Sequence, residues 1–189
     1  MIKKATHKVI LLNGLPATGK TTIGRAISQY LHAPLITLDT LKEAMFDELG
    51  IGDRDYNRML SRTCKKIIWA MISEFPDNAI VIVDAWFGRA PHDAVIHSIE
   101  ASGVSRFVEI WCHAPGAILK ERYIARVGER HPGHPGVEYG DELEQIASEV
   151  VPMCIGPSYN VDTSDLTGVE MQPILDWIVQ ELKIEPPVK

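Results

Sequence analysis

The sequence is poor in cysteine and has no long hydrophobic run. Its 189 residues include three cysteines, Cys64, Cys112 and Cys154, and no two of them form a C-x-x-C pair. This spacing argues against a disulfide framework and against a zinc site, so we expect three reduced core thiols in a cytoplasmic protein. No apolar run reaches the roughly 18 residues of a membrane span. The first run, residues 9–12, is also too short for a signal peptide, and we expect no membrane partner.

Positive charge is in the minority. The chain has 19 Lys and Arg against 25 Asp and Glu, a formal net charge of -6. Domains that bind nucleic acid usually carry a basic balance, so a nucleic-acid partner is disfavoured, although a local basic patch could still bind one. The length and the 46% hydrophobic content fit one globular domain with a full core, and we expect a single domain over residues 1–189.

Short apolar runs alternate with segments that are long enough for helices. Continuously or nearly continuously apolar runs are typical of parallel strands covered on both faces. They occupy residues 9–12, 35–38, 79–83 and 107–111, with a weaker strand at 159–161. Helix-length segments occupy residues 20–31, 40–49, 56–75, 91–101, 115–127, 141–150 and 169–182. This alternation predicts an α/β fold with helices on both faces of a parallel sheet.

A phosphate-binding loop follows the first predicted strand. Residues 14–21 match the complete G-x-x-x-x-G-K-[ST] pattern and directly precede a predicted helix. Its glycines let backbone N–H groups point at a phosphate, and the helix adds the positive end of its dipole. We expect Lys20 to bridge the β- and γ-phosphates of ATP and Thr21 to bind Mg²⁺. The predicted nucleotide-binding residues of this loop are Gly14, Pro16, Ala17, Thr18, Gly19, Lys20, Thr21 and Thr22.

Two aspartates follow the second and third strands. Asp84 comes directly after residues 79–83, a position from which a carboxylate can reach the magnesium ion. The alternative for Asp84 is a residue that caps a helix or turns the chain. Asp39 follows residues 35–38 and could be either a catalytic residue or the N-cap of the helix at Thr40.

These residues resemble the small P-loop kinases, AAA-type ATPase-like enzymes that include polynucleotide kinase, chloramphenicol phosphotransferase, gluconate kinase and the zeta-toxin-like kinases. The likeness covers most of the chain and lies in residues 14–21, 38–42 and 81–85 and in the arginine-bearing segment after the fourth strand. It implies a three-layer P-loop NTPase fold with a five-stranded parallel sheet of order 2-3-1-4-5 and a small lid at about residues 122–140. It also implies that Asp39 contacts the acceptor hydroxyl as base or orienter.

One departure from the family pattern concerns the residue three positions after Asp39. Polynucleotide kinases have Asp-x-x-Arg there, whereas this chain has Asp39-x-x-Lys42. A lysine keeps the positive charge but lacks the bidentate fork that holds a phosphate. The resemblance therefore does not extend to a nucleotide 3′-phosphate acceptor.

The predicted helix 115–127 places Arg122 and Arg126 on one stripe, four residues apart. An arginine that faces the transferred phosphoryl group stabilises its charge, and Arg126 and Arg130 are the candidates for this role. Arg122 lies nearer the helix start and is expected to stack on or flank the nucleotide base. The alternative is a solvated basic face paired with Glu121 and Glu129.

Residues 128–136 have the composition of a loop that hinges. Its two histidines, His131 and His134, are too few for a metal site. Ligands of an open parallel sheet bind beyond the carboxyl ends of the strands, so we expect the acceptor to contact Asp39, Lys42, Trp86 and Arg89. Trp86 and Phe87 could instead pack as core residues under the lid.

The sequence thus predicts an enzyme, a P-loop kinase that uses ATP and Mg²⁺ to phosphorylate a hydroxyl group of a small molecule. Two alternatives stay open. The first is a polynucleotide 5′-hydroxyl kinase, which requires a basic channel. The second is a regulatory or toxin-like module in which nucleotide binding controls a partner protein.

Overall fold

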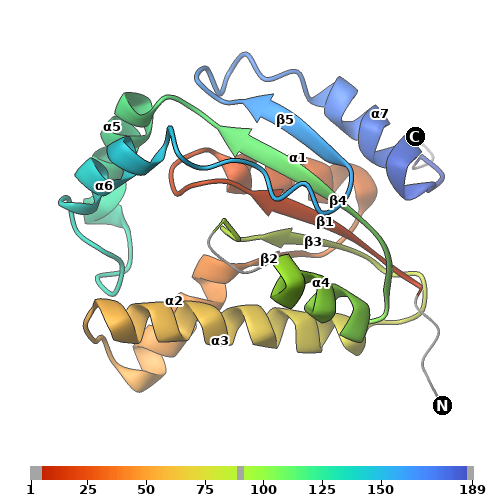
Figure 1. Cartoon of the computed structure of the whole chain (residues 1–189), viewed down its shortest axis with the longest axis horizontal. Helices are drawn as coiled ribbons and strands as arrows, with labels where there is room; N and C mark the ends of the chain where they lie inside the picture. The colour runs from red at the N-terminus through yellow and green to blue at the C-terminus, as the bar shows by residue number, and fades with distance from the viewer. Residues whose placement is uncertain (1–5, 89–91, 187–189) are drawn as a thin grey trace.

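A parallel sheet of five strands forms the centre of the molecule (Figure 1). The computed structural model describes residues 6–88 and 92–186. The strand order is β2-β3-β1-β4-β5, and every pairing is parallel, as predicted. The strands are β1 His7–Asn13, β2 Leu35–Thr37, β3 Ile80–Asp84, β4 Val104–His113 and β5 Ser158–Asp162.

Helices cover both faces of the sheet. Successive side chains of β1 point to opposite faces, so Ile10 and Leu12 pack on one side while Val9 and Leu11 pack on the other. The first side is covered by α1 and α7 and the second by α3 and α4, which gives three layers (Figure 1). These helices are α1 Lys20–Leu31, α3 Arg54–Ser73, α4 His92–Ala101 and α7 Met171–Leu182.

A third apolar cluster lies beyond the carboxyl ends of the strands. Leu15 of the phosphate-binding loop packs there with Leu119, Tyr123 and Leu143. The elements at this end are α2 Leu38–Leu49, α5 Gly116–Arg126, the 3₁₀ turn η1 Val127–Glu129 and α6 Tyr139–Ile146. Within residues 6–88 and 92–186, no helix combines the length and apolar character that crossing a membrane requires.

The structure decides one open alternative and corrects one expectation. Helix α2 begins at Leu38, and its N-cap is Thr37, whose hydroxyl accepts a hydrogen bond from the backbone N–H of Thr40. Asp39 therefore lies inside the first turn and is not the cap. Cys154 lies in a loop with a positive φ and is exposed, so it is not a core residue. Cys64 and Cys112 are buried thiols, as expected.

A buried carboxylate joins three segments at the base of the site. Glu109 of β4 is 1% exposed, and its Oε1 accepts hydrogen bonds from Asn13 Nδ2 at 2.7 Å and from the N–H of Met153 at 3.1 Å. Asn13 Oδ1 in turn accepts hydrogen bonds from the N–H groups of Gly14 and Phe87, both at 2.9 Å. The network thus ties the start of the phosphate-binding loop to the chain after β3.

We predict that Glu109→Ala lowers the free energy of unfolding by about 3 kcal/mol, because the buried donors that face this carboxylate lose their acceptor. Urea denaturation measures the effect. Glu100→Ala, at an exposed position of α4, is the control and is expected to change stability by less than about 0.5 kcal/mol. Equal stability of the two variants would contradict the structural role of Glu109.

Candidate active site

The phosphate-binding loop connects β1 to α1 and needs glycine at both ends. Gly14 has φ 141°, and a Cβ atom there would lie 2.2 Å from the carbonyl oxygen of Cys112. Gly19 has φ 79°, and a Cβ atom there would lie 2.3 Å from Leu166 Cδ2. At Gly14 the contact is with rigid backbone, so a side chain would clash there, whereas at Gly19 the flexible end of Leu166 could move and the positive φ is what favours glycine.

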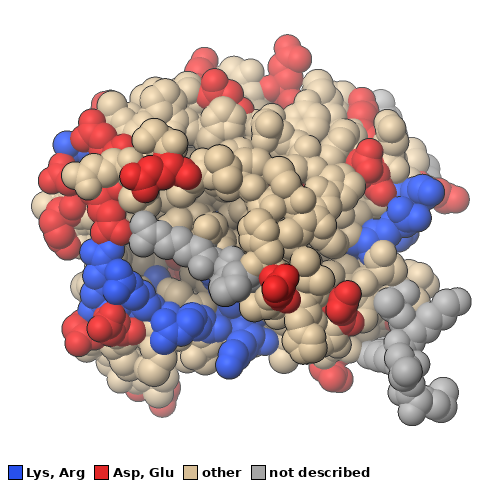
Figure 2. All heavy atoms as spheres, in the orientation of Figure 1, with Lys and Arg blue, Asp and Glu red and all other residues tan. Residues whose placement is uncertain are grey.

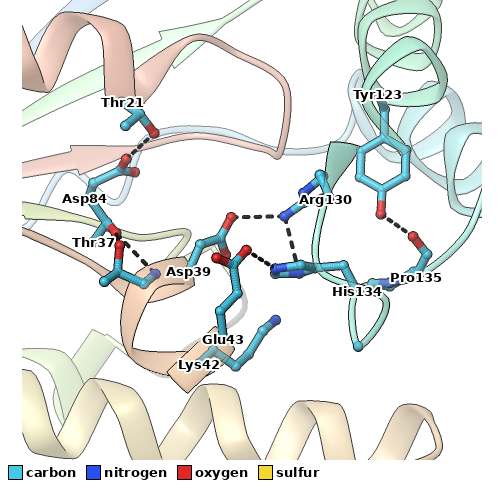
Figure 3. Close-up of polar contacts among 12 residues, drawn as sticks. Thr21, Thr37, Asp39, Lys42, Glu43, Asp84, Tyr123, Arg130, His134 and Pro135 are labelled. Atoms are coloured by element: carbon cyan, nitrogen blue, oxygen red, sulfur yellow. Dashed lines mark hydrogen bonds and ion pairs between the residues drawn. The ribbon is translucent and has the colours of Figure 1, made fainter. Parts of the chain in front are cut away.

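Lys20 and Thr21 begin α1 directly after the loop. Lys20 Nζ donates a hydrogen bond to the carbonyl oxygen of Leu15 at 2.8 Å. Thr21 Oγ1 donates to Asp84 Oδ2 at 2.6 Å, because the β1–β3 register places Asp84 beside Leu12 at the base of the loop (Figure 3). Burial raises the pKa of Asp84, and the charge of Lys20 opposes this rise. A hydroxyl and a carboxylate oxygen side by side are the donor types that Mg²⁺ prefers.

One cavity of about 920 Å³ joins the loop to the start of α2, to α3 and to the segment after α5. Most of the predicted site residues line it. These are Pro16, Ala17, Gly19, Lys20, Thr21, Thr22, Asp39, Lys42, Asp84, Trp86, Arg126 and Arg130. Gly14 and the buried Thr18 are not among the lining residues, and Arg89 lies outside the residues that the structure describes.

Asp39 is held by the segment that follows α5 (Figure 3). Its Oδ2 accepts a hydrogen bond from Arg130 Nη2 at 2.8 Å, and the same nitrogen lies 3.1 Å from His134 Nδ1. His134 Nε2 lies 2.7 Å from Glu43 Oε1. Since an arginine can only donate, Nδ1 of His134 is the acceptor, and Nε2 carries the proton that it donates to Glu43. The row Asp39–Arg130–His134–Glu43 thus begins and ends on α2.

Charge around this row keeps Asp39 ionised. Partial burial raises the pKa of Asp39, but the charges of His134, Arg130 and Lys42 outweigh that effect, so the pKa lies below its ordinary value. The pKa of His134 is also lowered, by burial first, and the charges of Arg130 and Lys42 act in the same direction against that of Asp39. At neutral pH the site therefore presents the Asp39 carboxylate beside the cations Arg130 and Lys42.

The segment 130–136 is docked onto α2 and α3. The ring of His131 stacks on Phe46 with centroids 5.2 Å apart, and its Nε2 lies 3.1 Å from Asp47 Oδ1. Asn57 Nδ2 of α3 donates to the carbonyl oxygen of Gly133 at 2.6 Å. Together with the contacts of His134, these bonds close one side of the cavity over Asp39.

The two remaining arginines lie in different places. Arg126 lines the cavity, and its pKa is lowered by burial and by the neighbouring charge of Arg130. The guanidinium of Arg122 donates to the carbonyl oxygens of Thr163 and Ser164 at 2.8 and 2.9 Å. Arg122 is thus attached to the loop after β5 and does not line the cavity. Arg122 and Arg126, although four residues apart on one face of the helix, therefore point to different places.

The aromatic pair after β3 is divided between two environments. Phe87 is 1% exposed and belongs to the core, in contact with Trp69. Trp86 lines the cavity and also packs against the third apolar cluster with Leu15 and Tyr123. The core alternative therefore holds for Phe87, and acceptor contact stays a prediction for Trp86.

Several residues of this site were not predicted from the sequence. Glu43, Asn57 and Lys65 line or support the cavity but come from helices whose motifs are weak. The spacing of Arg58, Arg62 and Lys65 along α3 was the available signal, because residues at i, i+4 and i+7 share one helical face. A local basic patch remained possible in spite of the acidic net charge, and such a patch lies on this face (Figure 2).

Comparison with known proteins identifies the family. Residues 9–138 match the family model AAA_33, described as an AAA domain. The chain belongs to this family. A candidate kinase from Chloroflexus aurantiacus is similar with a TM-score of 0.83 and 30% identity, over 94% of this chain and 99% of that one. Shikimate kinase from Bacteroides thetaiotaomicron shares the fold, with a TM-score of 0.58 and 20% identity over 93% and 98% of the two chains.

Curated relatives are longer. Mouse adenylate kinase 8 is 26% identical over 121 residues, which are 63% of this chain and 25% of that protein. The chain thus spans about a quarter of the length of this relative. Family and fold together confirm the predicted resemblance to the small P-loop kinases, and they support a phosphotransferase as the general activity class.

We predict that His134→Ala loosens the docked segment, because Arg130 and Glu43 lose the ring that joins them. Amide hydrogen exchange of residues 128–136 should become roughly 10-fold faster, as expected for the loss of one or two buried hydrogen bonds. His97→Ala, on the exposed side of α4, is the control. Unchanged exchange in the His134 variant would show that the segment is held by other contacts.

Proposed function

We propose that this protein transfers the γ-phosphoryl group of ATP to a hydroxyl group of a small molecule. The observation that carries the proposal is the shared cavity, in which Lys20 and Asp39 line the same space of about 920 Å³. A donor bound at the loop and an acceptor bound at Asp39 would face each other there. Phosphoryl transfer requires this alignment more than it requires covalent help from the protein.

The donor half comprises the loop and the residues next to it. The N–H groups of residues 14–21 and the N-terminus of α1 would bind the phosphates, and Lys20 would turn from Leu15 to the β- and γ-phosphate oxygens. Thr21 and Asp84 would hold Mg²⁺, which when bound neutralises charge on the phosphates. Arg122 and the loop at Thr163 and Ser164 would flank the base.

The acceptor half centres on Asp39. The acceptor hydroxyl would donate its hydrogen bond to this carboxylate, and its oxygen would bond to the γ-phosphorus while the bond to the ADP oxygen breaks. The proton passes to Asp39 and then to solvent. Because the pKa of Asp39 is low, the carboxylate acts chiefly as an orienter, which a loose transition state tolerates.

The lid is the segment of about residues 122–140, and it would act on both halves. Arg130 and Arg126 would stabilise the charge on the transferred phosphoryl group, since both line the cavity and Arg130 already contacts Asp39. Phosphoryl transfer as the general activity is supported by the candidate kinase from Chloroflexus aurantiacus, at 30% identity over nearly the whole chain. Mouse adenylate kinase 8, which is 26% identical over 121 residues, supports the same general activity.

We expect Lys20→Ala to reduce ATP turnover by on the order of 10³-fold, because the charge developing on the γ-phosphoryl group loses its cation. The rate is measured as the release of ADP in the presence of each of a panel of metabolites that carry a hydroxyl group. Circular dichroism should show an intact fold, and Arg106→Ala, at an exposed position of β4, should behave like the wild type. Turnover close to wild type in Lys20→Ala would rule out the proposal.

Asp39→Asn separates a kinase from a regulatory nucleotide-binding module. We expect kcat to fall by about 10² to 10⁴ while the Kd for ATP changes by less than about threefold, because the carboxylate acts on the acceptor and not on the donor. Asp47→Asn is the matched control, since Asp47 lies on the same helix and contacts the same docked segment through His131. A regulatory module would phosphorylate no acceptor, and Asp39→Asn would leave its nucleotide-dependent function unchanged. An unchanged kcat in the Asp39 variant would contradict the catalytic role of Asp39.

A further inference from the structure

Two lysines on the acceptor side of the cavity lack a carboxylate partner. Lys42 of α2 is 6% exposed, and its Nζ donates to Asn57 Oδ1 at 3.1 Å and reaches Ser61 Oγ at 3.5 Å. Lys65 of α3 is half-buried, and its Nζ lies 5.2 Å from the ring centroid of Phe87. Within residues 6–88 and 92–186, neither ammonium lies at ion-pair distance from an acidic side chain.

The protein stabilises these charges only in part, because the charge of Asp39 raises the pKa of Lys42 but does not offset the effect of burial. Burial lowers the pKa of Lys42, and it lowers the pKa of Lys65 to about 8, with the charge of Lys42 adding to the effect at Lys65. Two like charges on a partly buried wall of the cavity repel each other, and burying a cation without an anion is unfavourable in free energy. An anion placed between them would relieve both costs at once.

On α3, the cations without an acidic partner in the described part of the chain lie in the stretch after Arg58. Arg54 is paired with Glu142, and Arg58 is paired with Asp55 at 3.1 Å, so the beginning of the helix is neutralised. Arg62 and Lys66 follow on the cavity wall, and among the described residues neither has an acidic partner. Figure 2 shows the basic side chains gathered along the edge of the hollow, where α3 lies in Figure 1.

We propose that the acceptor carries an oxyanion, a carboxylate or a phosphate, which binds between Lys42 and Lys65 with Arg62 at its edge while the acceptor hydroxyl faces Asp39. This inference rests on the proposed function for the role of the bound molecule. Lysines bind as point charges without a fixed fork, so a small oxyanion of either kind suits them. The shortness of the unpaired stretch favours such a molecule over an oligonucleotide, which needs an extended row of cations.

Binding can be tested without turnover. The protein is saturated with Mg²⁺ and the non-hydrolysable AMPPNP, which occupies the phosphate-binding loop, and is then titrated calorimetrically with glycerol, glycerol 3-phosphate and glycerate. These probes share a small polyol frame and differ in charge, and the two anions separate phosphate from carboxylate. We expect at least one anion to bind at least 10-fold more tightly than glycerol.

Three variants assign the site. Lys65→Gln should weaken binding of the preferred anion about 10-fold, Lys65→Arg should retain it because the charge remains, and Arg106→Gln should match the wild type. The inference is overturned if no anion binds, if glycerol binds equally well, or if Lys65→Gln behaves like Arg106→Gln. Binding of a 5′-hydroxyl oligonucleotide with a steep salt dependence, in place of the small anions, would also overturn it.

The outcome is separate from that of the proposed function. Loss of the oxyanion site would leave the Lys20→Ala and Asp39→Asn results standing, since those variants report on the donor loop and on the acceptor hydroxyl. Oxyanion binding in a protein whose ATP turnover survives Lys20→Ala would instead remove the kinase assignment and keep the site.

Discussion

The pairing of β1 with β3 is the interaction on which the rest of the site depends. It aligns Leu12 with Asp84, and so places a carboxylate next to the hydroxyl of Thr21 at the carboxyl end of the sheet. Parallel strands deliver all their following loops to this one edge, which is why the phosphate-binding loop, the chain after β3 and the start of α2 meet there. The buried Glu109–Asn13 network holds two of these loops in place from below.

The part of the site around Asp39 is held by a chain of contacts between side chains. Asp39 and Glu43 lie one turn apart on α2, and Arg130 and His134 approach them from the other side of the cavity. Because His134 contacts both Arg130 and Glu43, the position of the arginine depends on the ring beside it. An arginine stabilises a transferred phosphoryl group only if it is held in position. The contacts of Arg130 with Asp39 and His134 would hold it there.

The charge of the whole protein is a poor guide to the charge of its cavity. A net charge of -6 coexists with a wall on which Lys42, Lys65 and Arg62 have no acidic partner among the described residues. Most of the acidic side chains lie elsewhere on the surface or pair with the cations at the start of α3. Selectivity for an acceptor depends on this local balance, because fields between exposed charges are screened within about 10 Å.

The sequence by itself determined the alternation of strands and helices and the phosphate-binding loop, since apolar runs and glycine positions are local signals. The strand order was predicted only through the resemblance to the P-loop kinases. The sequence also determined which loop residues face the cavity, with Gly14 and Thr18 as the exceptions. Only the tertiary structure decided the rest. The attachment of Arg122 to the loop at Thr163 and the meeting of His134 with Glu43 depend on contacts between residues far apart in the chain, which periodicity and spacing do not encode.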